Sequence, residues 1–306
     1  GVAVGWSFVI SPMYNAEIAP PEIRGKLVAL SDVFINIGLV LGYVLAFVFD
    51  NNISGAWKWR VMLGMGVVPP FLILLTLLFL PESPRWLMTQ KKEAEALRVL
   101  NRLTPSKKEA KKVFHNIKQA NQDATEATWG QVLWNRRRAV RKTVFIVLGL
   151  CFAQQASGSE VVVYYTPTVL HSAGFESKDM LFLGAIIVGL CKLIGEVVAL
   201  CLVETIGRTA MLNMSAMLAS VSMCFLTCSL SFEWSPYWNL LGLCMFMWWF
   251  SFGIGPITWV VASELLPSPL RAKALSIGVL LNRATSGLCA SGFLTMAKAP
   301  TPRGAR

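Results

Sequence analysis

Long apolar stretches alternate with short polar segments along nearly the whole chain. Many of these stretches contain about 20 residues, the length that a helix needs to cross a hydrocarbon core of roughly 30 Å. Lipid offers no partner for a free backbone N–H or C=O, so such stretches are expected to be helical. The pattern predicts about eight spans, at residues 1–13, 28–49, 60–80, 143–168, 181–203, 210–230, 239–262 and 275–297.

The composition agrees with this pattern. Hydrophobic residues make up 55% of the chain and charged residues only 15%, which is too apolar for a soluble domain of this length. The seven cysteines lie almost entirely in apolar stretches without a C-x-x-C pair, and the two histidines are far apart. We therefore expect a multi-pass membrane protein with no disulfide framework, no metal site and no organic cofactor.

Most of the formal net charge of +11 lies in one polar segment, residues 81–142, which holds 15 Lys and Arg against six Asp and Glu. An excess of Lys and Arg marks cytoplasmic loops. Alternation along the chain places the basic segments 15–26, 204–209 and 263–273 on the same side. A nucleic-acid-binding surface is the alternative for segment 81–142, but spans flank it on both sides, so we expect no nucleic-acid partner.

Within segment 81–142, two highly charged stretches predict short surface helices at 91–103 and 109–120.

A separate pattern, an internal repeat, connects the two halves of the chain. Four residues recur in register 247 positions later: Glu17, Pro20, Arg24 and Lys26 match Glu264, Pro267, Arg271 and Lys273. Repeated helix bundles are the usual construction of secondary transporters.

The repeat also predicts what a complete protein would contain. Its second copy follows the fourth span after segment 81–142, whereas its first copy follows only one span. We therefore expect about three further spans before residue 1 and about one after the last span, with 299–306 as a divergent tail.

Several motifs carry a family resemblance. They are Pro81–Leu87 (PESPRWL), Gln154–Gly158 (QQASG) followed by Tyr164–Tyr165, Glu204–Arg208 (ETIGR), and Gly255–Trp259 (GPITW) leading to Glu264 and Arg271. Together they resemble the sugar porters of the major facilitator superfamily over the whole chain except the tail. Within that family, Asp32, Lys192 and the stretch Asn282–Gly287 look most like plant polyol and monosaccharide proton symporters.

The resemblance implies an all-α membrane protein with a partial major facilitator fold, about 8 of 12 transmembrane helices in a two-bundle architecture. Residues 1–80 would be the C-terminal half of the first bundle, 81–142 a cytoplasmic linker and 143–298 most of the second bundle. The implied activity is transport of a polyol or monosaccharide by alternating access, not enzymatic catalysis. Coupling to protons is implied by the resemblance alone, because the family's proton-accepting Asp lies in a helix expected before residue 1.

Polar groups inside spans cost about 2.5–3.5 kcal/mol for Asp or Lys at a helix centre, so they indicate function or a wet cavity. Amide side chains suit a polyol because each offers a donor and an acceptor to hydroxyl groups. Ser157–Ser159 predicts a helix break beside them. The resemblance implies substrate contacts for Asp32, Gln154, Gln155, Glu160, Lys192, Trp259 and Asn282.

Alternatives stay open for several of these residues. Gln154 and Gln155 can join helices by hydrogen bonds without touching substrate. The indole of Trp259, which the resemblance places against a pyranose face, can be a packing residue. Lys192 can pair with Glu196 one turn away, or reach Glu160 or Asp32 across a cavity.

A second group of charges lies at the expected cytoplasmic helix ends. We expect salt bridges between the bundles there, which would hold one state of the carrier and break in the other. Topology signalling and helix capping are the alternative. The residues are Glu17, Arg24, Glu204, Arg208, Glu264 and Arg271.

The rival function is that of a truncated membrane protein without transport activity, either a gene fragment or a regulatory partner of full-length carriers. A hydrolase is excluded because Ser157, Ser159 and Glu160 have no nearby His. The expected partners are a small polyol or sugar and the lipid bilayer. The plasma membrane is the expected location and the vacuolar membrane the alternative, while the oligomeric state stays open.

Overall fold

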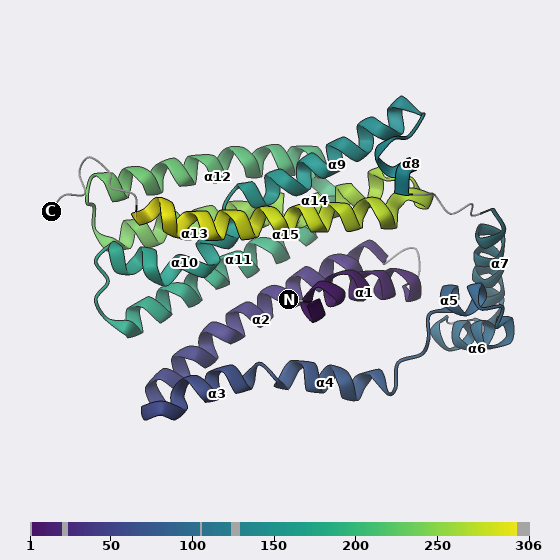
Figure 1. Ribbon diagram of the computed structural model, residues 1–306, viewed down its shortest axis with the longest axis horizontal. Coiled ribbons are helices and arrows are strands. Elements are labelled where there is room, and N and C mark those ends of the chain that lie inside the picture. Colours follow the sequence, from purple (N-terminus) through teal and green to yellow (C-terminus); the bar gives the residue numbers. More distant parts are fainter. Residues whose placement is uncertain (1, 20–23, 105, 124–128, 299–306) are drawn as a thin grey trace. The chain divides into compact units, whose positions relative to one another are not determined.

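The computed structural model describes residues 2–19, 24–104, 106–123 and 129–298, and all regular elements in this part of the chain are helical (Figure 1). This confirms the predicted all-α class. The elements are α1 (Val2–Ile18), α2 (Arg24–Asn52), η1 (Gly55–Trp57), α3 (Lys58–Met65), α4 (Val68–Leu77), α5 (Pro84–Thr89), α6 (Glu93–Leu103), α7 (Lys107–Asp123), α8 (Trp129–Leu133), α9 (Arg138–Ala156), α10 (Ser159–Ser172), α11 (Lys178–Ile206), α12 (Arg208–Ser231), α13 (Pro236–Phe252), α14 (Ile254–Leu265) and α15 (Ser268–Lys298).

Six helical segments of the described chain are long and apolar enough to cross a membrane. They coincide with the second to seventh predicted spans. The first and last predicted spans are helical too, as α1 and α15, but α1 has only 17 residues and α15 carries several charges, so membrane crossing stays a prediction for both. The six segments are Leu30–Asn52, Lys58–Leu77, Arg138–Ser172, Lys178–Ile206, Arg208–Ser231 and Pro236–Leu265.

The chain forms two compact units. The first comprises Gly1–Asp32 and Val48–Glu126, and the second comprises Val33–Phe47 and Ala127–Arg306. The middle of α2 thus belongs to the second unit, where the Tyr43 hydroxyl donates to the Val163 carbonyl of α10 at 2.7 Å. The domain boundaries predicted at residues 80 and 142 stay predictions.

In the first unit, α5, α6 and α7 pack around a small apolar core. Helices α6 and α7 confirm the two predicted surface helices, while α5 and α8 lie where no helix was predicted. The hydroxyl of Ser83 caps α5 by accepting from the Trp86 N–H at 3.3 Å, and Pro84 occupies the first helical position. The core residues are Leu87, Met88, Ala96, Leu100, Ala110 and Ile117.

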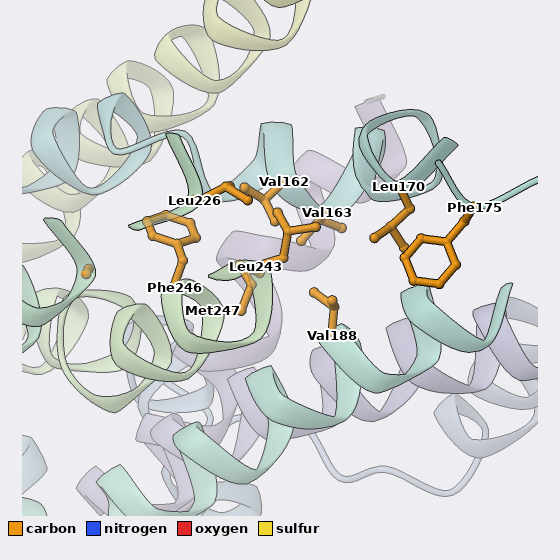
Figure 2. Packing of buried hydrophobic residues seen from close by; sticks show 10 residues of the cluster. Val162, Val163, Leu170, Phe175, Val188, Leu226, Leu243, Phe246 and Met247 are labelled. Atoms are coloured by element: carbon orange, nitrogen blue, oxygen red, sulfur yellow. The ribbon is translucent and has the colours of Figure 1, made fainter. Parts of the chain in front are cut away.

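In the second unit, α13 packs against both α11 and α12. Figure 2 shows the apolar core at this junction, where Leu243, Phe246 and Met247 of α13 face Leu226 of α12 and the valines of α10. Small residues allow the close approach, since a Cβ on Gly195 of α11 would lie 2.8 Å from the Trp248 carbonyl oxygen. Membrane helices associate through such packing because lipid tails are as apolar as the side chains.

Two spanning segments of the second unit are broken helices. The predicted break at Ser157–Ser159 is confirmed: α9 ends at Ala156, and Gly158 has a φ of +82°, which a residue with a Cβ adopts only with strain. The predicted span 239–262 lies within the spanning segment Pro236–Leu265, which is interrupted at Gly253 between α13 and α14.

A side chain from α12 stabilises the break at Gly253. Ser215 is fully buried and its Oγ donates to the Trp249 carbonyl at 2.6 Å, while accepting from the Ile254 N–H at 3.0 Å. The hydroxyl thus satisfies backbone groups next to the break. Gly253 is required because a Cβ there would lie 2.4 Å from Ser215 Cβ and 2.6 Å from the Met211 carbonyl oxygen.

Replacing Gly253 with Ala should therefore lower the stability of the folded chain by about 2 kcal/mol, the usual cost of overpacking a core. Thermal unfolding in detergent, followed by size-exclusion chromatography, measures the effect. Gly149→Ala is the matched control, because nothing lies within 4 Å of the added Cβ in the middle of α9. Equal melting temperatures for the two variants would contradict the assignment of Gly253 as a packing constraint.

Candidate functional site

A cluster of three amide side chains joins the break between α9 and α10 to α15. Asn282 Nδ2 donates to Gln154 Oε1 at 2.7 Å and to the Cys151 carbonyl at 2.9 Å. Gln155 Nε2 donates to Asn282 Oδ1 at 3.3 Å. The structure thus brings together three of the predicted site residues on the last turn of α9 and the middle of α15.

The same cluster reaches the second broken helix. Gln154 Nε2 donates to the carbonyls of Gly255 at 2.6 Å and Ile254 at 3.3 Å, at the start of α14. The Ser157 hydroxyl donates to the Gln154 carbonyl at 2.6 Å and closes the last turn of α9. One glutamine side chain therefore connects the two helix breaks.

The amide cluster is almost completely shielded from solvent. Gln154, Gln155 and Asn282 have exposed fractions of 5%, 4% and 0%. All amide groups of Gln154 and Asn282 take part in the contacts above, but Gln155 Oε1 has no hydrogen-bond partner among the described residues. A buried acceptor without a partner costs free energy, so this oxygen is the atom of the cluster suited to accept a hydrogen bond from a bound molecule.

An ion pair between α15 and α10 lies close to the amide cluster in the sequence. Arg283 Nη1 of α15 contacts Glu160 Oε1 in the first turn of α10 at 3.3 Å, and the side chains are 39% and 19% exposed. The two charges are within reach of each other because Arg283 follows Asn282 and Glu160 follows the break. Arg283 was not predicted as a site residue, although an arginine inside an expected span was a signal that it needs a partner.

Trp259 lies on α14 and is partly buried. Its indole packs against an apolar cluster. This cluster includes Val147 of α9, Ala262 of α14 and Leu266, which directly follows α14. This contact agrees with the packing alternative, and contact with a substrate stays a prediction for this residue.

Asp32 and Lys192 belong to different units. Asp32 lies in the first unit and Lys192 in the second, on α11, and both are partly buried. Glu196, one turn after Lys192, is buried. The structure pairs Glu160 with Arg283. The predicted pairing of Lys192 with Glu160, Asp32 or Glu196 stays a prediction.

Three of the predicted gating residues form a network within the second unit. Arg208 Nη2, at the start of α12, contacts Glu264 Oε1 of α14 at 2.9 Å, and its Nη1 contacts Glu204 Oε2 of α11 at 3.5 Å. Arg271 instead donates to the Leu266 carbonyl at 3.3 and 3.2 Å, which closes the turn before α15. Exposed pairs of this kind contribute at most about 1 kcal/mol to stability.

The first copy of the repeat makes different contacts. Glu17 accepts a short hydrogen bond from the Ser83 hydroxyl, and the Tyr14 hydroxyl donates to the Pro81 carbonyl at 2.6 Å. These contacts connect the end of α1 to the Pro81–Leu87 motif. The side chain of Arg24 lies outside the described residues. A gating role stays a prediction for all six charged residues.

In the described part of the chain, no three His, Cys, Asp or Glu side chains come together as the ligands of a metal ion would. The chemistry of the site is thus that of amide and carboxylate hydrogen bonding around helix breaks. Such an arrangement can bind a neutral polyhydroxylated molecule, because amides donate and accept while the ion pair leaves no net charge.

Comparison with known proteins bears on the family. The sequence profile described as "Sugar (and other) transporter" matches residues 1–304. "Putative polyol transporter 1" of Arabidopsis thaliana is 36% identical, over 100% of this chain and 64% of its own length. The "Galactose-proton symporter" of Escherichia coli K12 is 31% identical, over 97% of this chain and 63% of its own length.

Solved structures agree with the sequence relatives. The xylose transporter XylE from E. coli in a partially occluded inward-open conformation superimposes with a TM-score of 0.83 at 29% identity, covering 98% of this chain and 63% of that chain. The proton:xylose symporter XylE bound to 6-bromo-6-deoxy-D-glucose gives a TM-score of 0.82 at 30% identity, over 97% of this chain and 62% of that one. The chain thus spans slightly less than two thirds of the proteins it matches.

The profile match, the relatives and the superpositions confirm the predicted resemblance and the partial major facilitator fold. Six segments capable of crossing a membrane, together with this family, make the chain an integral multi-pass membrane protein. The family is one of transporters, so the prediction that the chain is not an enzyme is confirmed. The chain belongs to the sugar transporter family of the major facilitator superfamily.

Proposed function

We propose that this chain supplies the substrate-binding part of a carrier that moves a polyol or monosaccharide across a membrane by alternating access, with the proton as coupling ion and no other cofactor. The observation that carries the proposal is the buried amide cluster of Gln154, Gln155 and Asn282 at the break of a spanning segment. Buried polar groups are costly unless they are hydrogen-bonded, and this cluster keeps one acceptor without a partner among the described residues, Gln155 Oε1.

The chemistry of the cluster favours hydroxyl groups. Each hydroxyl both donates and accepts, and the unpartnered Gln155 Oε1 can accept the hydrogen of one of them. Gln154 and Asn282 hold each other in fixed orientations, so the cluster is preorganised before substrate arrives. Glu160 would accept from an adjacent hydroxyl, while Asp32, Lys192 and Trp259 would add contacts that select among substrates.

The relatives support the substrate class and the coupling ion. Six Arabidopsis proteins named as polyol transporters match this chain at 32–36% identity. Two of the further matches named above are proton symporters of galactose and xylose. These names support a polyol or monosaccharide and a proton, without selecting one substrate.

The two helix breaks give the proposed cycle a physical basis. Gln154 hydrogen-bonds to the start of α14 as well as to α15, so a substrate that competes for its amide would act on both breaks. In many secondary carriers, broken helices form the substrate site, and access alternates as the two helix bundles rock against each other around it. The charged groups of Glu17, Arg24, Glu204, Arg208, Glu264 and Arg271 would then stabilise one end state at the helix ends.

We propose that the protein is located in the plasma membrane. The vacuolar membrane is the alternative, and a localisation experiment distinguishes the two. A fluorescent fusion expressed in plant cells gives this result directly. The partners in the proposal are the small-molecule substrate and the bilayer.

Uptake measurements test the proposed function. In a transport-deficient yeast strain, residues 1–298 replace the aligned segment of an Arabidopsis polyol transporter, and uptake of labelled sorbitol, mannitol, myo-inositol and glucose is measured at pH 5 and pH 7. We expect acid-stimulated uptake of at least one of these compounds. The parent polyol transporter and the unmodified chain are assayed beside the chimera.

A chimera that reaches the membrane but takes up none of the four compounds would contradict the proposal, provided that the parent is active. The rival function, a membrane protein without transport activity that acts on full-length carriers, has its own readout. Coexpression of the unmodified chain with the parent would then change the parent's uptake.

A second test separates substrate binding from helix joining at Gln155. Gln155→Leu should raise the KM of the chimera about tenfold, because the loss of one hydrogen bond to substrate costs about 1.4 kcal/mol. Its melting temperature should fall by less than that of Asn282→Leu, because the substitution removes one hydrogen bond of the fold, from Gln155 Nε2 to Asn282 Oδ1. Asn282→Leu is the comparison, since it breaks three hydrogen bonds and should lower the melting temperature further. An unchanged KM for Gln155→Leu would favour the helix-joining alternative.

A third test concerns the ion pair of Glu160 and Arg283. Glu160→Gln and Arg283→Gln each remove this partly buried ion pair, and each should be destabilising. The double variant should be less destabilised than the sum of the two, with a coupling free energy of about 1–3 kcal/mol. Thermal unfolding of the four proteins in one detergent gives this number, and additive effects would show that the pair is not coupled.

A further inference from the structure

The start of α9 carries a dense group of basic side chains that the proposed function does not use. Arg136, Arg137, Arg138, Arg141 and Lys142 fall within seven consecutive residues, and all five are exposed. In the described part of the chain, none of the five forms an ion pair with an acidic side chain. Their charge is therefore available to a ligand.

The basic side chains of the helix proper share one face with an aromatic ring. Arg138, Arg141 or Lys142, and Phe145 follow one another at helical spacings of three and four residues. A hollow of about 420 Å³ lies on this face, lined by Arg138, Ala139, Arg141, Lys142 and Phe145. The hollow thus combines three cationic groups with a phenyl ring.

The face remains apolar farther along the helix. Phe145 and Phe152 are 58% and 50% exposed, one above the other at a spacing of seven residues. The opposite side of α9 is packed, since Val144, Val147 and Cys151 are at most 1% exposed. The open face therefore changes from cationic to aromatic in the direction of the spanning segment.

The position of the hollow along the span determines its surroundings. The spanning segment Arg138–Ser172 begins with Arg138, the first of the three basic residues that line the hollow, so we expect these residues at the level of the lipid headgroups. Trp134, just before α9, is 81% exposed, as is usual for an interfacial tryptophan. Figure 1 shows α8 beside the first turns of α9 at this end of the second unit.

We propose that this face of α9 binds an anionic phospholipid of the surrounding bilayer, with the phosphate in the hollow between Arg138, Arg141 and Lys142 and an acyl chain along Phe145 and Phe152. Charge complementarity supports the headgroup, because juxtamembrane basic residues attract anionic lipids by about 1 kcal/mol each. The exposed rings of Phe145 and Phe152 support a lipid over a soluble anion, because an acyl chain can pack against them and a free phosphate cannot.

Lipid retention by the full chain tests the proposal. The chain is purified in a neutral detergent, and native mass spectrometry and thermal unfolding are recorded with added phosphatidylserine or phosphatidylcholine. We expect bound phosphatidylserine and a raised melting temperature, because a ligand of the folded state stabilises it. The Arg138→Gln, Arg141→Gln, Lys142→Gln variant should bind phosphatidylserine on the order of 100-fold more weakly.

A matched variant controls for net charge. Lys107, Lys108 and Lys111 are equally exposed on α7, and their replacement by Gln removes the same three charges outside any spanning segment. This control should retain phosphatidylserine binding to within about threefold, because none of the three lysines lines the hollow and attraction by other exposed charges is screened by salt. If the triple variant at α9 does not fold, Arg141→Gln alone should weaken binding about fivefold.

Three results would overturn the proposal. Equal loss of binding in the α7 control would show a response to net charge alone. Equal retention of phosphatidylcholine would show no selection for an anionic headgroup. Equal stabilisation by inorganic phosphate would assign the hollow to a soluble anion.

Discussion

Every backbone polar group that leaves a helix inside the bilayer needs a partner from the protein, and the arrangement of the second unit depends on this constraint. Two spanning segments of this unit are broken, at Gly158 and at Gly253. Ser215 supplies a hydroxyl to backbone groups at the second break, and Gln154 reaches carbonyls beside it from the first. The groups that satisfy the breaks thus also hold α9, α12, α14 and α15 together.

The same constraint accounts for the composition of the candidate site. Amide side chains satisfy backbone carbonyls and still present groups that pair with hydroxyls, so they can stabilise a broken helix and bind a neutral substrate at once. Charges are tolerated beside them only as a pair, as with Glu160 and Arg283. A site without net charge is suited to an uncharged polyol or sugar.

Outside the spans, charged side chains are exposed to solvent and need no buried partner. The helices α6 and α7 display their charges to solvent around a small apolar core, and Arg208 shares two glutamates at the helix ends. At the start of α9 the basic side chains have no acidic partner among the described residues and lie above an aromatic face. A density of positive charge that determines topology can therefore also determine which lipids surround the helix.

The sequence by itself determined the helical class, the six spanning segments, the break at Gly158 and the family, because hydrophobicity, glycine spacing and motifs are local properties of the chain. The tertiary structure decided the rest through contacts between distant residues. The break at Gly253 depends on Ser215, which lies 39 positions from Ile254, and the partner of Glu160 lies 123 positions away. Gln154, Gln155 and Asn282 were predicted one by one, but their hydrogen bonds arise only because α9 packs against α15. No local pattern contains the geometry of such pairs, since the folding of the bundle creates it.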